Sequence, residues 1–107
     1  MARERLLIVE DHKMFGEALQ SILSRLPEVA ETRLVSVYRE ILAQASGFQP
    51  TVVALDISVN QHSTIPLIAE LRALDSVPKV LVVTMHNDVV VAQAAVRAGA
   101  AGYLLKD

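Results

Sequence analysis

Short apolar runs alternate along this chain with stretches in which apolar residues recur every three or four positions. The continuous runs predict buried β-strands, and the longer spacing predicts helices with one buried face. Five strands are predicted, at residues 5–10, 32–37, 51–56, 79–84 and 101–105. Strands that alternate with helices through short connections are typical of the α/β class, a parallel sheet with helices on both faces and right-handed crossovers.

Four helices are predicted between these strands. The first is expected to end before Pro27, the second at Gly47 and the fourth at Gly99, and Pro66 suits the first turn of the third. Asn87 or Asp88 can cap the fourth helix. The predicted buried face of the first helix consists of Met14, Phe15, Ala18, Leu19, Ile22, Leu23 and Leu26.

Two segments do not fit this regular alternation. The polar stretch 57–64 contains no glycine and is predicted to be an irregular, mobile loop. The fifth strand is followed only by Lys106 and Asp107, so the domain is expected to lack its last helix. Without that cover, an apolar patch beside residues 101–105 is expected to invite self-association, so a homodimer is possible.

Length and composition narrow the class of protein. With 107 residues the chain is expected to form one domain, 1–107. Hydrophobic residues make up 52% and aromatic residues 4%, which favours a core of aliphatic side chains. A net charge of −2 gives no basic patch for nucleic acid, and without cysteine there is no disulfide or thiolate metal site. No apolar run reaches the ~18 residues of a membrane span, so a soluble cytoplasmic protein is expected.

Polar side chains stand at the ends of four of the predicted strands. Glu10 and Asp11 follow the apolar run LLIV of the first, Asp56 ends the third, Thr84 ends the fourth, and Lys106 follows the fifth. In an open parallel sheet the ligand crevice lies beyond the carboxyl ends of the strands, so these side chains are expected to meet there. Three carboxylates suit Mg²⁺, which takes oxygen ligands. Asp56 can then act as a nucleophile toward phosphorus, with Thr84 and Lys106 holding the phosphoryl oxygens.

Each of these residues also has an ordinary structural explanation. An acidic residue after a strand is more often a helix cap or a solvated turn, a terminal lysine is usually on the surface, and threonine is a good strand residue. The joint occurrence at four strand ends favours a phosphoryl site. His12 and His86 border that site without a partner at metal-ligand spacing, and His62 lies in the polar loop, so all three are predicted to be solvated.

The segments LLIVEDHKMFGEAL, VVTMHND and AGYLLKD, with the strand that ends in Asp56, resemble in order the receiver domain of two-component response regulators. The amino-acid sequence of the last two segments looks most like that of the NarL-type transcriptional regulators. The resemblance covers the whole chain. It implies a flavodoxin-like, doubly wound sheet of order 2-1-3-4-5, and a signalling domain that is not an enzyme in the usual sense.

The resemblance also implies roles for individual residues. Asp56 would accept phosphate from a sensor histidine kinase, and Glu10, Asp11, Asp56 and the backbone carbonyl of Ser58 would hold Mg²⁺. Thr84 and Lys106 would contact the phosphoryl group, and Thr84 and Tyr103 would form the switch. Ser58 and His86 would tune the lifetime of the phosphoryl group. DNA would be bound only through an output domain that is not in this chain.

Two alternatives remain open from the residues. The family usually has Met-Pro-Gly after its phosphoacceptor, whereas here Asp56 is followed by Ile57, Ser58 and Val59. A pseudo-receiver that signals by dimerisation without phosphorylation is therefore the alternative function. A haloacid-dehalogenase-like phosphatase would usually carry a second aspartate where this chain has Ser58, so that enzyme class is disfavoured.

Overall fold

The computed structural model describes residues 3–85 and 89–105 of the chain. The main strands are β1 (Glu4–Val9), β2 (Val29–Val35), β3 (Val52–Asp56), β6 (Lys79–Thr84) and β7 (Gly102–Leu105). Two short strands, β4 (Ser58–Val59) and β5 (His62–Ser63), lie between β3 and β6. The helices are α1 (Lys13–Leu23), α2 (Ile41–Phe48), α3 (Ile65–Arg72) and α4 (Val89–Ala98), with one 3₁₀ turn, η1 (Tyr38–Glu40).

The five main strands form one parallel sheet in the order β2-β1-β3-β6-β7. When the two short strands are left out of the count, this is the predicted order 2-1-3-4-5, so the predicted flavodoxin-like fold is confirmed. Because all five strands are parallel, their carboxyl ends meet at one edge of the sheet. None of the helices within 3–85 and 89–105 is both long and apolar enough to cross a membrane.

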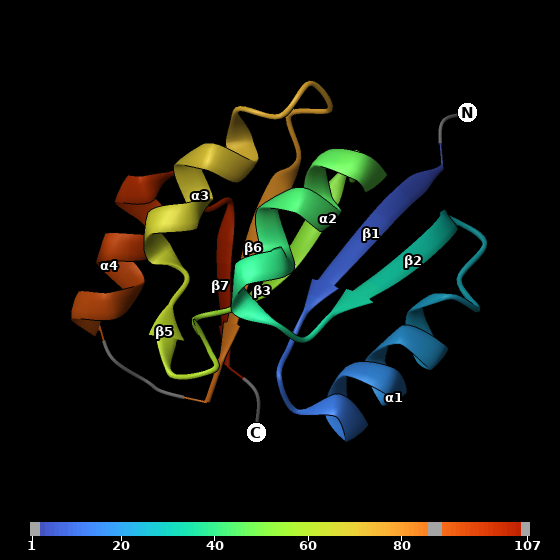
Figure 1. Cartoon of the computed structure of the whole chain (residues 1–107), viewed down its shortest axis with the longest axis horizontal. Coiled ribbons are helices and arrows are strands. Elements are labelled where there is room, and N and C mark those ends of the chain that lie inside the picture. The colour runs from blue at the N-terminus through green and yellow to red at the C-terminus, as the bar shows by residue number, and fades with distance from the viewer. Residues whose placement is uncertain (1–2, 86–88, 106–107) are drawn as a thin grey trace.

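The helices are distributed unevenly over the two faces of the sheet. Helices α2, α3 and α4 lie side by side across one face, and α1 stands apart from them beside β2 (Figure 1). The main core forms under the three-helix layer and includes Leu7, Val53, Leu55, Val80 and Val82, all fully buried. Alternate strand residues point to the opposite face, which α1 covers in part.

The predicted buried face of the first helix is wrong at five of its seven residues, and only Leu19 and Leu23 are half-buried. Met14 is 86% exposed, and Phe15 and Ile22 are also exposed, whereas Gly16 is buried. The helix approaches β2 so closely at Gly16 that an added Cβ would lie 2.8 Å from a methyl carbon of Leu34. A glycine contributes no apolar signal, so the true contact face was hidden from the hydrophobic pattern.

Several predicted boundaries also move. Helix α1 ends at Leu23 because the Ser24 hydroxyl donates to the Gln20 carbonyl (2.7 Å) and the next turn tightens. The second strand covers 29–35 instead of 32–37, since it pairs with β1 from Val29 onward. Helix α2 continues through Gly47 to Phe48, and the left-handed cap is Gln49, with a φ of 51°. The predicted caps Asn87 and Asp88 lie outside the described residues.

The predicted irregular loop 57–64 is instead an ordered hairpin. Strands β4 and β5 pair in antiparallel register, and the turn residues Asn60 and Gln61 both have positive φ, 50° and 67°. Two consecutive left-handed residues are the signature of a type I′ hairpin turn, whose twist matches the flanking strands. Asparagine tolerates this conformation better than most residues do, so no glycine is needed.

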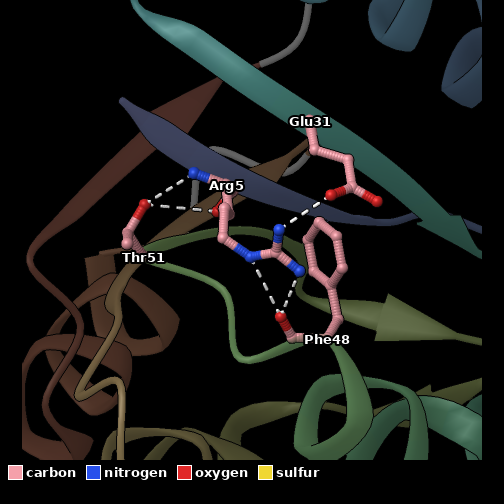
Figure 2. A network of polar contacts seen from close by, with 4 residues as sticks. All are labelled: Arg5, Glu31, Phe48 and Thr51. Carbon is pink, nitrogen blue, oxygen red and sulfur yellow. Dashed lines mark hydrogen bonds and ion pairs between the residues drawn. The ribbon is translucent and has the colours of Figure 1, made fainter. Parts of the chain in front are cut away.

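The amino-terminal end of the sheet is fixed by Arg5 on β1. Its guanidinium donates twice to the carbonyl of Phe48 (2.7 and 3.1 Å), pairs with Glu31 on β2 (2.7 Å) and lies over the Phe48 ring at 4.3 Å (Figure 2). The Arg5 backbone also bonds to the Thr51 hydroxyl. This network joins β1, β2, α2 and the start of β3, and so aligns three neighbouring strands.

The apolar patch expected beside residues 101–105 is present. Leu104 and Leu105 on β7 are 54% and 44% exposed, and Leu105 lines a cavity of about 410 Å³ between β7 and α4. Self-association through this patch stays a prediction.

Candidate functional site

The acidic pair lies where β1 ends at the carboxyl edge of the sheet. The Glu10 backbone N–H still donates to the Val35 carbonyl (3.0 Å), which keeps Glu10 next to β2, and the residue is only 3% exposed. Asp11 is partly exposed at the start of the loop into α1. The His12 backbone N–H donates to Glu10 Oε2 (3.1 Å), and its ring Nδ1 lies 3.2 Å from the same oxygen. A buried carboxylate therefore sits beside a more accessible one.

Asp56 is the last residue of β3 and is 8% exposed. Its backbone is held from the far side of the hairpin, because the Thr64 hydroxyl donates to the Asp56 carbonyl at 2.6 Å. The Thr64 N–H donates in turn to the Ile57 carbonyl (2.9 Å). The Asp56 peptide is thus fixed from both the sheet and the start of α3.

The predicted hydroxyl and switch residues lie on the neighbouring strands. Thr84 ends β6 and is fully buried, and in the strand register it faces Leu105. Tyr103 on β7 faces Val82 and is half-buried against the core. Lys106 and His86 lie outside the described residues.

These elements together line one cleft at the sheet edge. The cleft has a volume of about 210 Å³. Its walls come from the end of β1, the end of β3 with the hairpin, and the end of β6; they consist of Asp11, His12, Asp56, Ile57, Ser58, Gln61, Thr84 and Met85. The predicted residues Asp11, Asp56, Ser58 and Thr84 are thus brought together, whereas Tyr103 lines a different cavity, against α4.

The donor set of this cleft fits a divalent cation. Glu10, Asp11, His12 and Asp56 can each present one ligand atom such that all four atoms lie within 4.8 Å of one another. Metal–oxygen bonds of about 2.0–2.1 Å place the ligand atoms of one Mg²⁺ within roughly that distance of each other. Three carboxylates so close together repel, and a cation between them relieves the repulsion.

Four residues in or near the site were not recognised from the sequence. His12 was expected to be solvated without a partner, and it is largely exposed, yet its ring lies against Glu10. His62 is exposed, as expected, and its ring also stacks on Tyr38 with centroids 4.9 Å apart. Asn60 and Thr64 were read as loop residues. The Asn-Gln turn was the only sequence signal for the hairpin, and it is weaker than Asn-Gly.

The chain belongs to the response regulator receiver domain family, whose model matches residues 6–107. Among its relatives, the transcriptional regulatory protein DegU of Brevibacillus brevis is 26% identical over 96% of this chain and 44% of DegU. The transcriptional regulatory protein YvfU of Bacillus subtilis is 33% identical over 96% of this chain and 52% of YvfU. The chain therefore spans about half the length of these relatives.

Solved structures agree with this assignment. A response regulator from Burkholderia pseudomallei, solved with a phosphorylated aspartic acid, a calcium ion and citrate, superposes with a TM-score of 0.88 at 28% identity and covers 96% of this chain and 59% of its own. A LuxR-family response regulator from Aurantimonas superposes with a TM-score of 0.87 at 26% identity and covers 98% of this chain and 75% of its own.

The sequence relatives also include the nitrate/nitrite response regulator protein NarL of Escherichia coli, which is 24% identical over 95% of this chain and 47% of NarL. The chain is a receiver domain of the NarL/LuxR type, a signalling domain and not an enzyme of the usual kind.

Proposed function

We propose that the chain is a working phosphoacceptor, in which a sensor histidine kinase phosphorylates Asp56. The observation that carries this proposal is the cleft in which Asp56, two further carboxylates and the Thr84 end of β6 converge. Receiver domains as a family are phosphorylated by such kinases, and the similar Burkholderia structure contains a phosphorylated aspartic acid.

In the proposed reaction, an Asp56 carboxylate oxygen attacks the phosphorus of the kinase phosphohistidine. The new P–O bond forms as the P–N bond breaks, and the imidazole leaves with the electron pair. Glu10, Asp11, Asp56 and the Ser58 carbonyl would hold Mg²⁺, which neutralises charge on the phosphoryl oxygens. Because Glu10 and Asp56 are nearly buried, their positions are fixed before the phosphoryl group arrives.

The remaining proposed roles lie on β6, β7 and the segments that follow them. The buried Thr84 hydroxyl would bind a phosphoryl oxygen. Tyr103, which lies two residues before the strand partner of Thr84, would respond to the change in packing. Lys106 is proposed to hold another phosphoryl oxygen. Ser58, which lines the cleft, and His86 are proposed to tune the lifetime of the phosphorylated state.

We assign the output function to the part of the relatives that this chain does not match. Several relatives are named as transcriptional regulators, and one from Mycobacterium tuberculosis, 25% identical, is named a DNA-binding transcriptional activator. The receiver would therefore control transcription through a DNA-binding output domain. The pseudo-receiver alternative has no observation in its favour.

Intact-mass spectrometry tests the phosphoacceptor role. The wild type incubated with acetyl phosphate and Mg²⁺ is expected to gain one phosphoryl group, and the gain is expected to disappear with EDTA or with Asp56→Asn. Asp75→Asn is the matched control, because Asp75 is an exposed carboxylate in the loop before β6, at the other end of that strand. Absence of labelling in the wild type, or equal labelling in Asp56→Asn, would contradict the proposal.

A further inference from the structure

The hairpin after Asp56 reaches back across the cleft to the acidic pair. The Asn60 backbone N–H, at the hairpin turn, donates to Asp11 Oδ2 at 2.9 Å, across 49 positions of sequence. Asp11 comes from the end of β1, whereas Asn60 follows β3. The turn therefore connects one proposed metal ligand to the segment that carries the phosphoacceptor.

The Asn60 side chain fixes the direction of that backbone N–H. Its Oδ1 accepts a hydrogen bond from the Tyr38 N–H at 2.7 Å, at the start of η1. The backbone φ of 50° is left-handed, a conformation that asparagine adopts far more readily than alanine does. Two independent properties of this one residue thus aim its N–H at Asp11.

The hairpin itself has other anchors. Val59 is fully buried in the core, and the His62 ring stacks on Tyr38. A residue that served only to form the turn would need no contact with either Tyr38 or Asp11, because Val59 and His62 already hold the hairpin down. The bond from Asn60 to Asp11 therefore calls for an explanation in terms of the site.

We propose that Asn60 is a positioning residue that holds the Asp11 carboxylate in place for the divalent cation. A free aspartate loses side-chain freedom when it binds an ion, and the hydrogen bond to Oδ2 restricts that freedom in advance. The other carboxylate oxygen of Asp11, Oδ1, takes no part in the hydrogen bond with Asn60. Asp11 presents a ligand atom within 4.8 Å of those of Glu10 and Asp56, as a shared cation requires.

This inference rests on the proposed function, in that it takes the cleft to bind Mg²⁺. The size of the effect follows from a single hydrogen bond to a charged group that is partly exposed to water. Losing such a bond corresponds to roughly three- to tenfold weaker binding. Asn60→Ala removes both Oδ1 and the left-handed preference, so it is expected to show the full effect. Asn60→Gly keeps the backbone conformation accessible and is expected to show about half of it on a logarithmic scale.

The experiment measures Mg²⁺ affinity by NMR titration of the whole chain, following the backbone amides. Tyr38→Leu is the matched control, because it removes the ring on which His62 stacks, while the Tyr38 backbone N–H can still donate to Asn60 Oδ1 and His62 Nδ1 still lies 2.9 Å from the Asn60 carbonyl oxygen. Its Mg²⁺ affinity is expected to stay within twofold of the wild type. In acetyl phosphate labelling, Asn60→Ala is expected to need more Mg²⁺ for half-maximal rate and to reach the same rate at saturating Mg²⁺. A purely structural defect would lower that rate as well.

The possible outcomes separate the two proposals. A wild type that binds no Mg²⁺ at millimolar concentration would contradict the proposed function. If the wild type binds Mg²⁺ but Asn60→Gly and a folded Asn60→Ala match it within twofold, the role of Asn60 is refuted. Equal weakening in Tyr38→Leu, or tighter binding in either Asn60 variant, would refute it as well. Should Asn60→Ala fail to fold, Asn60→Gly alone decides, because its left-handed backbone is unstrained.

Discussion

Replacing Thr64 by valine would remove a buried hydroxyl while keeping nearly the same shape. Thr64 is fully buried, and its hydroxyl donates to the Asp56 carbonyl at 2.6 Å. Valine cannot donate, so a carbonyl beside the buried Asp56 side chain would lose a partner. Leaving such a group unsatisfied costs about 1–3 kcal/mol, and the extra apolar methyl offsets part of that. We expect a net loss of about 1–2 kcal/mol in the free energy of unfolding.

For a domain of 107 residues, 1 kcal/mol corresponds to a change of about 4 °C in the unfolding midpoint, so Thr64→Val is expected to melt roughly 4–8 °C below the wild type. Urea denaturation with an unchanged m-value would assign the loss to the native state. Thr32→Val is the matched control, since Thr32 is half-buried on β2 and its hydroxyl makes no hydrogen bond to the described residues. If both variants melt within about 1 °C of the wild type, the reasoning about the Thr64 hydroxyl is refuted.

Three further predictions concern the packing, the backbone and the donor set. Phe48→Ala is expected to lower the free energy of unfolding by about 3–5 kcal/mol in urea denaturation, because the ring is fully buried beneath two guanidinium groups. Phe15→Ala, on the exposed side of α1, should cost much less. Equal losses in the two variants would contradict this prediction. Gly99→Ala is expected to lower stability by about 1–2 kcal/mol, because the φ of Gly99 is 115° and alanine would be strained there. Gly47→Ala, inside α2 with open space around it, should raise stability by up to about 1 kcal/mol. A higher melting temperature for Gly99→Ala would refute the argument from backbone strain. His12→Ala is expected to weaken Zn²⁺ binding by about tenfold or more in calorimetry and to leave Mg²⁺ binding almost unchanged. The reason is that imidazole is a good zinc ligand, whereas magnesium prefers oxygen. Equal effects on both ions would exclude His12 as a ligand.

The strand pattern predicted the sheet because continuous apolar runs and strand-terminal polar residues both reflect burial. Asp56 and Thr84 stand at the ends of β3 and β6 as expected, and Glu10 follows β1 by one residue. These positions follow from parallel topology alone, which brings carboxyl ends together whatever the loops do.

The missed features depend on contacts that hydropathy does not record. The burial of Gly16 comes from the Leu34 side chain, which packs against the backbone of α1, and a residue without a side chain leaves no periodic signal. The hairpin at Asn60 depends on two left-handed residues that are not glycine. The absence of Gly and Pro after Asp56 was read as a sign of mobility, yet the same residues form β4 and β5. The sequence contained a turn-forming residue, Asn60, but the segment was predicted to lack a defined turn because it has no glycine.

The ordered hairpin changes which part of the site can adapt. Thr64 bonds to the Asp56 carbonyl at the end of the segment, and Asn60 bonds to Asp11 in the middle of it. One short segment therefore fixes both the proposed phosphoacceptor and a proposed metal ligand, and buried Val59 anchors it to the core. A packed hairpin has few alternative conformations compared with a glycine-rich loop. Any rearrangement on phosphorylation should therefore leave this segment in place and act through the Thr84 side of the cleft. Amide exchange in the phosphorylated protein should accordingly show unchanged protection at Val59; lost protection there would locate the switch in the hairpin instead.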